Sequence, residues 1–532
     1  MGILWYGGKI YTMKSASDMV EAVYTDNGKI IATGSLKELK ETYNGLIDEV
    51  FDLEGNVMYP GFVDSHLHII GHGEKLLHVD LSMMESAEQV LEAIAEKIKG
   101  LHNGEWLVAE GWNENQWIDK RIIDKHELDQ LSRETPIILT RICRHAVIVN
   151  SKALELANLT SATEDPQGGR IVRDKNGEPT GYLLDQAQEL VKDVMPSVSQ
   201  ELLEKTTETA IKDLLSKGLV GGHTEDLAYY SGFEPTLKAY QSILPKKYKF
   251  RAHLLVHHLV FDEMREAGYT YGDGGEYTTL GAMKIFSDGA LGGRTAWLSE
   301  PYADDPANVG IPIHSEERLE ALVKYAREFG HPIAVHAIGD QAVLQVAKLL
   351  KKYPLENNRR DRIIHAQIVN DQVIQLLKEM DVVLDIQPTF VSSDFPWVIE
   401  RIGEKRAERS YPWKTFLREN IVCAAGSDAP IEEAGPLNGI KAFVTRQSSI
   451  DGKVYGHGEQ LSVYEAISLY TKGSAYVINH EHDRGIINKG YVADFTILEE
   501  DLFTVAHSRI DQVKVTGTIV AGEWMYRSRQ KN

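Results

Sequence analysis

The chain has 532 residues, of which 43% are hydrophobic and 25% charged, which is enough apolar material for a large core and too much for a disordered protein. Its 57 basic and 78 acidic side chains give a formal net charge of −21, which repels phosphate backbones and anionic lipid heads and makes nucleic acids and membranes poor partners. No secretory signal and no apolar run of about 18 residues is visible, and two cysteines cannot form a disulfide framework, so a cytoplasmic protein is expected.

Short β-rich segments with turns occupy both ends of the chain. Residues 1–58 include Lys9–Thr12 and Lys29–Gly34, and residues 481–532 include Ala493–Leu498. Neither end is long enough to form a stable core alone. We therefore expect residues 1–58 and 481–532 to pair into one small β-sandwich domain.

The middle of the chain, residues 59–480, alternates apolar β-rich runs with amphipathic helices such as Glu316–Phe329. This alternation predicts the α/β class with a parallel sheet, and eight runs are the number that closes a (β/α)₈ TIM barrel. The gap after the first run is too long for one crossover, so an inserted α/β segment is expected at about residues 69–215. The predicted strands are Val57–His68, Leu219–Glu225, Phe250–His257, Leu280–Ser287, Pro332–Ala337, Arg362–Gln367, Val382–Gln387 and Ile421–Ser427.

Histidines and one aspartate stand at the ends of these strands. His66 and His68 are two residues apart on the first strand, so their side chains point to the same side, as two ligands of one metal ion require. His336 closes the fifth strand, His365 lies in the sixth and Asp428 ends the eighth, so all three are at or near the barrel face where such enzymes hold their sites. A core histidine explains any one of these positions but not the set. The set predicts a metal site.

Lys284 lies inside an otherwise apolar strand. A buried ammonium needs a partner or a lowered pKa. Two interpretations follow: a lysine that reaches solvent or forms a salt bridge, or a carboxylated lysine whose carbamate oxygens bridge two metal ions.

Weaker candidates for substrate contact are His145, His223, Arg294 and Trp112. His223 is a candidate because it ends the second strand and could face the pocket. The others have an ordinary alternative: a hydrogen-bonded histidine for His145, a loop salt bridge for Arg294, and packing within the insertion for Trp112.

The sequence resembles the metal-dependent amidohydrolase superfamily, and within it amidohydrolase family 3, the branch of proteins similar to N-substituted formamide deformylase. The resemblance covers nearly the whole chain and includes motifs at Pro60–His68, Lys284–Arg294, His336–Asp340, Arg362–Gln367 and Gly426–Pro430. It departs from the branch at Ile364, where Glu is common, and in the second-strand segment Gly222–Asp226. The resemblance implies one metal ion held by His66, His68 and Asp428, a second held by His336 and His365, and a carboxylated Lys284 between them.

The expected reaction is hydrolysis of a C–N bond other than a peptide bond, in a non-peptide amide of the N-acyl or N-formyl amine type. A divalent metal ion lowers the pKa of bound water to about 7, which supplies hydroxide at neutral pH, and Asp428 would accept and return the proton. Zinc suits these ligands, as one or two ions per chain, with manganese and iron as alternatives. Other interpretations are a mononuclear deaminase or cyclic-amide or amidine hydrolase, and a catalytically silent scaffold. The expected partner is a small-molecule substrate, and a homodimer is the expected assembly.

Overall fold

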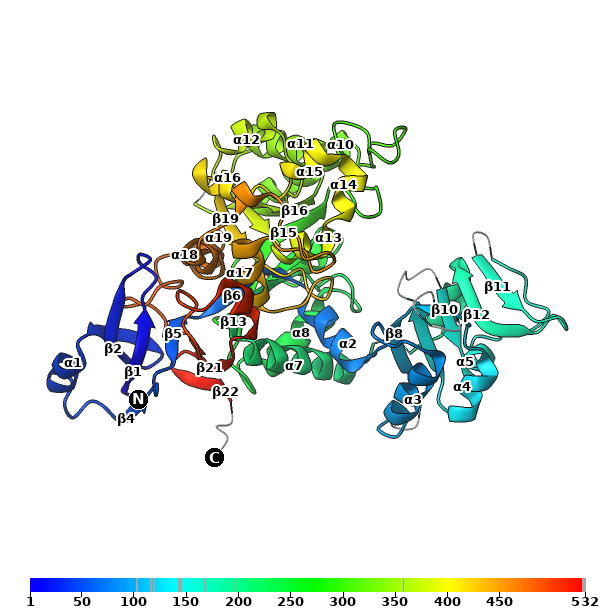
Figure 1. Ribbon diagram of the computed structural model, residues 1–532, viewed down its shortest axis with the longest axis horizontal. Helices are drawn as coiled ribbons and strands as arrows, with labels where there is room; N and C mark the ends of the chain where they lie inside the picture. Colours follow the sequence, from blue (N-terminus) through cyan, green and yellow to red (C-terminus); the bar gives the residue numbers. More distant parts are fainter. Residues whose placement is uncertain are drawn as a thin grey trace. The chain divides into compact units, whose positions relative to one another are not determined.

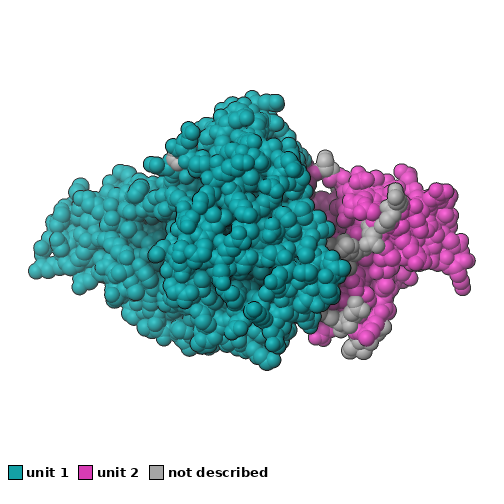
Figure 2. All heavy atoms as spheres, turned by 90° about the horizontal axis from the view of Figure 1, so that it is seen from above, with its two compact units in different colours: residues 1–72, 203–532 teal, residues 73–202 magenta. Residues whose placement is uncertain are grey.

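The computed structural model describes residues 1–528 except for 102–103, 115–116, 118–119, 142–145, 167–168, 197 and 357. The chain divides into two compact units, which Figure 2 colours separately. Unit 1 contains residues 1–72 and 203–532, and unit 2 contains residues 73–202.

An eight-stranded parallel sheet forms the centre of unit 1 (Figure 1). The segment after its last strand is bonded to its first strand, because Asp428 N donates to the His66 carbonyl at 2.8 Å and His68 N donates to the Ala429 carbonyl at 2.7 Å. The predicted α/β class with a (β/α)₈ barrel is confirmed, and every predicted barrel strand is present. In sheet order, the strands are β6 (Phe62–Leu67), β13 (Leu219–Thr224), β14 (Arg251–His257), β15 (Thr278–Phe286), β16 (Ile333–Ala337), β17 (Asp361–His365), β18 (Val382–Ile386) and β19 (Val422–Ala425).

Helices alternate with the barrel strands along the chain. In α10 (Glu316–Glu328), the side chain of Ser315 caps the N-terminus by accepting from Arg318 N, and Leu319 and Val323 lie on the buried face at helical spacing. The other helices after β13 are α8 (Phe233–Ile243), α9 (Phe261–Glu266), α11 (Asp340–Lys352), α12 (Asp371–Leu377), α13 (Thr389–Asp394), α14 (Trp397–Ile402), α15 (Glu404–Glu408), α16 (Trp413–Arg418), α17 (Pro436–Thr445), α18 (Val463–Ser468) and α19 (Ser474–Val477). Among the described residues, no helix has the length and apolar character needed to cross a membrane.

Strands from both ends of the chain form a second sheet of eight strands in unit 1. Its order is β22-β21-β20-β5-β1-β2-β3, and β4 also pairs with β1. The two ends share a core, since the Trp5 ring stacks on Phe51 at 4.9 Å and meets Phe495 edge-on at 5.9 Å. The bounds are β1 (Ile3–Tyr11), β2 (Met19–Asp26), β3 (Lys29–Gly34), β4 (Glu49–Asp52), β5 (Val57–Pro60), β20 (Phe495–Leu498), β21 (Val515–Val520) and β22 (Glu523–Arg527), with α1 (Leu36–Thr42) after β3.

The apolar run 57–68, predicted as one strand, is divided between the two sheets. β5 pairs with β20, β6 pairs with β13, and Gly61 lies between them. A Cβ atom at Gly61 would meet the Val220 side chain at 2.5 Å, so only glycine allows this close approach. The strand that carries the histidine pair is thereby attached directly to the terminal sheet.

Unit 2 has its own six-stranded sheet, in the order β11-β12-β10-β9-β8-β7. Its core includes Trp112, Leu128 and Ile148. The elements are β7 (Val79–Asp80), β8 (Leu107–Trp112), β9 (Ile137–Arg141), β10 (Ala146–Val149), β11 (Gly169–Arg173), β12 (Pro179–Asp185), α3 (Ala87–Ile98), α4 (Lys125–Leu131), α5 (Ser151–Leu156) and α6 (Glu189–Lys192). Helices α2 (Ile69–Leu77) and α7 (Gln200–Ser216) cross the two chain boundaries between the units.

Candidate metal centre

Three of the predicted metal ligands meet at the C-terminal end of the barrel strands. His66 lies on β6, His68 follows that strand, and Asp428 lies in the segment after β19. The Asp428 Oδ1 atom is 3.4 Å from His66 Nε2 and 3.5 Å from His68 Nε2. One ligand atom from each residue lies within 4.8 Å of the other two, an arrangement that can hold a metal ion.

The backbone of the two segments fixes this group. The carboxylate of Asp64, 1% exposed, accepts hydrogen bonds from His66 N at 3.1 Å and from Ser427 N and Oγ at 3.1 and 2.6 Å. Between the segments, a Cβ atom at Gly426 would meet His66 N at 2.5 Å. The positions of the ligands therefore follow from the way the first and last barrel strands are joined.

Nearby charged groups shift the pKa values of His68 and Asp428 in opposite directions. Burial lowers the pKa of His68, but its hydrogen bond to Asp428 and the charge of Glu225 outweigh burial and raise the pKa to about 9. Burial raises the pKa of Asp428, but the hydrogen bond from His68 outweighs it and holds the pKa below its usual value. The second ring nitrogen of His68, Nδ1, donates to the Glu225 carbonyl at 2.7 Å, which leaves Nε2 directed at Asp428. Metal-binding histidines are commonly oriented by such a bond.

The fifth- and sixth-strand histidines lie beside this group. The ring centre of His365 is 4.5 Å from that of His336 and 5.7 Å from that of His66. His365 Nδ1 donates to the side-chain oxygen of Gln387 at 2.7 Å, and Gln387 Nε2 donates to the Asp385 carbonyl at 2.9 Å. Burial lowers the pKa of His365 to about 4, so its imidazole is neutral at neutral pH, the form that binds metal ions.

Lys284 on β15 is fully buried at the centre of these side chains. Its Nζ atom is 3.5 Å from His66 Nε2 and 4.5 Å from the ring centre of Phe286. Burial lowers the pKa of Lys284, and the lysine forms no ion pair with any described residue. An unpaired ammonium is costly in such a place, so the neutral amine or a modified lysine is favoured.

The four predicted substrate contacts have the following surroundings. Trp112 is fully buried in the core of unit 2 and donates from Nε1 to the Leu139 carbonyl at 3.0 Å. The Arg294 side chain, 36% exposed, forms an ion pair with Asp304 at 2.8 Å. His223 is buried inside the barrel, with Nδ1 3.4 Å from Arg362 Nη1. His145 lies outside the described residues.

Three residues that position the ligands were not predicted from the sequence: Asp64, Glu225 and Gln387. Asp64 and Glu225 lie inside segments already noted for their histidines, and Gln387 ends a predicted strand. A polar residue at the C-terminal end of a barrel strand was the available signal.

Residues 49–526 match the model of the Amidohydrolase family. The chain belongs to this family. This amidohydrolase is 48% identical to amidohydrolase YtcJ of Bacillus subtilis (strain 168), and the match covers 99% of each chain. It is 24% identical to the N-substituted formamide deformylase of Arthrobacter pascens, over 97% of each chain.

Among solved structures, the amidohydrolase resembles an uncharacterized metal-dependent hydrolase from Pyrococcus horikoshii OT3, with a TM-score of 0.81 and 28% identity. The superposition covers 96% of this chain and 99% of the other. Family membership and this neighbour support a hydrolase that acts on C–N bonds. The group formed by His66, His68 and Asp428 indicates a divalent metal site.

Proposed function

We propose that this amidohydrolase cleaves the C–N bond of a non-peptide amide, of the N-acyl or N-formyl amine type, with zinc at the barrel mouth. The observation that carries the proposal is the buried group of His66, His68 and Asp428 with Lys284 beside it. The full-length match to a relative named N-substituted formamide deformylase supports the choice of substrate type.

The donor set fits such an ion. Two imidazoles and a carboxylate are ligands that zinc accepts, and the Nε2 atoms of His66 and His68 both lie close to Asp428 Oδ1. His66, His68 and Asp428 would hold one ion, and His336 and His365 a second. A divalent ion at this site supplies an activated water molecule and polarises the substrate carbonyl.

Asp428 is the proposed proton acceptor. Its carboxylate is ionised at neutral pH, because the hydrogen bond from His68 holds its pKa low. It can accept a proton from water as the amide carbon is attacked and then deliver that proton to the nitrogen of the departing amine.

Lys284 is the proposed site of carboxylation. Its neutral Nζ would attack carbon dioxide, so that an N–C bond forms, an electron pair moves to oxygen and one proton is lost. The product would be a carbamate next to His66, whose Nε2 atom is 3.5 Å from Lys284 Nζ, and its oxygens could serve as metal ligands. Intact mass spectrometry should show the mass of one added carbon dioxide in wild type and not in Lys284→Gln. An unmodified lysine in the fully metallated enzyme would argue for a single ion.

A hydrolysis screen tests the function. Zinc- and manganese-loaded protein is incubated with N-formyl, N-acetyl and cyclic amides, and free amine and carboxylate are measured, with Asp428→Asn as control. We expect turnover of an acyclic N-formyl or N-acyl amine by wild type only. Release of ammonia from an amidine, or turnover of cyclic amides alone, would replace the proposal with the deaminase or cyclic-amide hydrolase. Equal rates for wild type and Asp428→Asn would remove Asp428 from the mechanism.

A further inference from the structure

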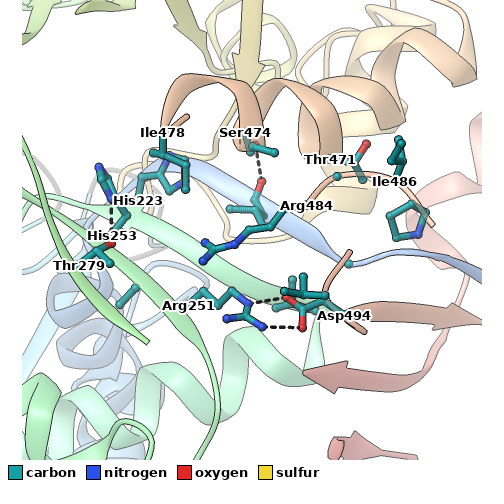
Figure 3. A pocket seen from close by; sticks show the side chains of 18 of the residues that line it. His223, Arg251, His253, Thr279, Thr471, Ser474, Ile478, Arg484, Ile486 and Asp494 are labelled. Carbon is teal, nitrogen blue, oxygen red and sulfur yellow. Dashed lines mark hydrogen bonds and ion pairs between the residues drawn. The ribbon is translucent and has the colours of Figure 1, made fainter. Parts of the chain in front are cut away.

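A cavity of about 30 Å³ lies in unit 1 at the opposite end of the barrel strands from the metal centre. Its wall includes residues of β13 and β14, of the helical segment 471–478 and of the C-terminal segment 484–494 (Figure 3). This volume accommodates about two to three water-sized groups. An occupant would therefore contact both the barrel and the segment that leads into the terminal sheet.

Two buried histidines line this cavity, and one of them, His223, has an unused N–H group. Arg362 can only donate, so its contact of 3.4 Å requires His223 Nδ1 to accept, and the hydrogen of His223 is on Nε2. That Nε2 atom is buried and has no hydrogen-bond partner among the described residues. Nε2 of His253 also has no hydrogen-bond partner among the described residues, but it lies against Gly281, where a Cβ atom would meet it at 2.4 Å. A buried donor without an acceptor is costly.

Two arginines and two carboxylates line the cavity, but both carboxylates pair with the same arginine, Arg251. The side chain of Asp494 is 7% exposed and accepts hydrogen bonds from Arg251 Nε at 2.5 Å and from Arg251 Nη2 at 3.0 Å. Its Oδ1 atom also accepts a hydrogen bond from Ala521 N. Arg251 also reaches Glu276, whose side chain is 59% exposed. Asp494, the deeply buried carboxylate that lines the cavity, is therefore already paired with Arg251.

Arg484 remains without such a partner. It forms no ion pair with any described residue, and its buried Nε atom has no hydrogen-bond partner among them. Figure 3 shows its guanidinium within the ring of labelled side chains, beside the Arg251–Asp494 pair. Burial, together with the positive charges of Arg362 and Arg484, lowers the pKa of His223, so the surroundings repel cations.

We propose that this cavity binds one small monovalent anion, of the size of chloride or formate, through Arg484 and the Nε2–H group of His223. The anion compensates the unpaired guanidinium and accepts the unused N–H group. Because Arg484 belongs to the C-terminal segment and His223 to β13, the bound anion links that segment to the barrel.

Thermal unfolding of the full chain tests the proposal. Sodium chloride, bromide or formate is titrated against sodium gluconate at constant ionic strength, since the six-carbon gluconate is too large for the cavity. In wild type, we expect the unfolding midpoint to rise and saturate with the small anions. In Arg484→Met, this rise should be lost, while the midpoint in gluconate is equal to or above that of wild type. Arg409→Met, a change at a side chain 56% exposed, should keep the wild-type response.

The proposal is overturned if wild type unfolds at the same midpoint in chloride, formate and gluconate, which would mean that water fills the cavity. It is equally overturned if Arg484→Met keeps the saturable rise. A second measurement does not depend on the variant: crystals grown in bromide should show anomalous scattering from one ion beside Arg484. Absence of that peak at saturating bromide would also reject the site.

Discussion

The two ends of the barrel both bury histidines, but with opposite surroundings. At the C-terminal end, His68 faces Asp428 at 3.5 Å, and this carboxylate helps to raise its pKa to about 9. At the N-terminal end, His223 faces Arg362 at 3.4 Å, and burial together with this guanidinium lowers its pKa. The negative surroundings of His68 thus favour a cation at one end of the barrel, and the positive surroundings of His223 favour an anion at the other. The neighbours, rather than the histidine itself, determine the chemistry.

Between the two ends lies an apolar cluster of Leu255, Ala282, Ala334 and Ile364, contributed by β14, β15, β16 and β17. Ala282 and Ala334 precede Lys284 and His336 by two residues, so they lie one step below the metal centre on the same strand faces. We expect this cluster to keep the two polar regions separate.

Metal removal should have the largest effect, and only at the C-terminal end. Dialysis against a chelator should abolish the whole catalytic acceleration, which is at least about a million-fold for typical enzymes, and zinc should restore it. The rate of amide hydrolysis before and after dialysis measures this. The anion response of the unfolding midpoint should persist in the metal-free protein. Full activity after complete metal removal would exclude metal-dependent hydrolysis.

Breaking the buried pair at the N-terminal end should cost stability. The side chains of Arg362 and Asp385 are 1% and 0% exposed and 3.1 Å apart. Arg362→Met leaves Asp385 buried without its partner and should reduce the free energy of unfolding by about 3–5 kcal/mol, measured by urea denaturation. Arg362→Met with Asp385→Leu should regain much of this loss. If folded Arg362→Met no longer bound metal, the two ends would not be independent.

At the metal end, Gln387 orients His365 through a hydrogen bond. Gln387→Met removes the acceptor of His365 Nδ1 and should weaken metal affinity by about 10- to 100-fold, as expected for a residue that orients a ligand. Gln387→Glu keeps an acceptor and should retain affinity. Chelator competition measures both variants, and the absorption spectrum of the cobalt-substituted protein reports the ligand geometry. Equal affinity in Gln387→Met and wild type would contradict this role.

Arg294 should show the smallest effect. Its exposed ion pair with Asp304 contributes little to stability, so Arg294→Ala should leave thermal unfolding nearly unchanged. If Arg294 serves only to form this ion pair and does not contact the substrate, KM for the best amide substrate should also be unchanged. A clear rise in KM without a change in kcat would instead place Arg294 at the substrate, as the sequence suggested.

The barrel and its ligand candidates could be predicted because both produce local patterns. Apolar runs alternate with amphipathic helices, and His66, His336 and His365 stand at strand ends. The division of the run 57–68 between two sheets was not visible, because β5 and β6 form one continuous apolar segment and only Gly61 separates them. Whether two strands belong to one sheet depends on partners distant in the sequence.

The same limit applies to single side chains. Trp112 belongs to a type common in binding pockets, but its partner is a carbonyl of the neighbouring strand, at Leu139. The role of Gln387 depends on its contact with His365, and that of Arg484 on the absence of a described ion-pair partner. None of these contacts leaves a periodic pattern in the sequence.

A divalent metal ion held where His66 meets Asp428 can be tested by elemental analysis of the purified full chain, expressed with ample zinc and manganese. Wild type is compared with His66→Asn and His253→Asn. We expect one or two ions per chain in wild type and in His253→Asn, and the loss of at least one ion in His66→Asn. Equal metal content in folded His66→Asn and wild type, or no tightly bound metal in wild type, would contradict this expectation.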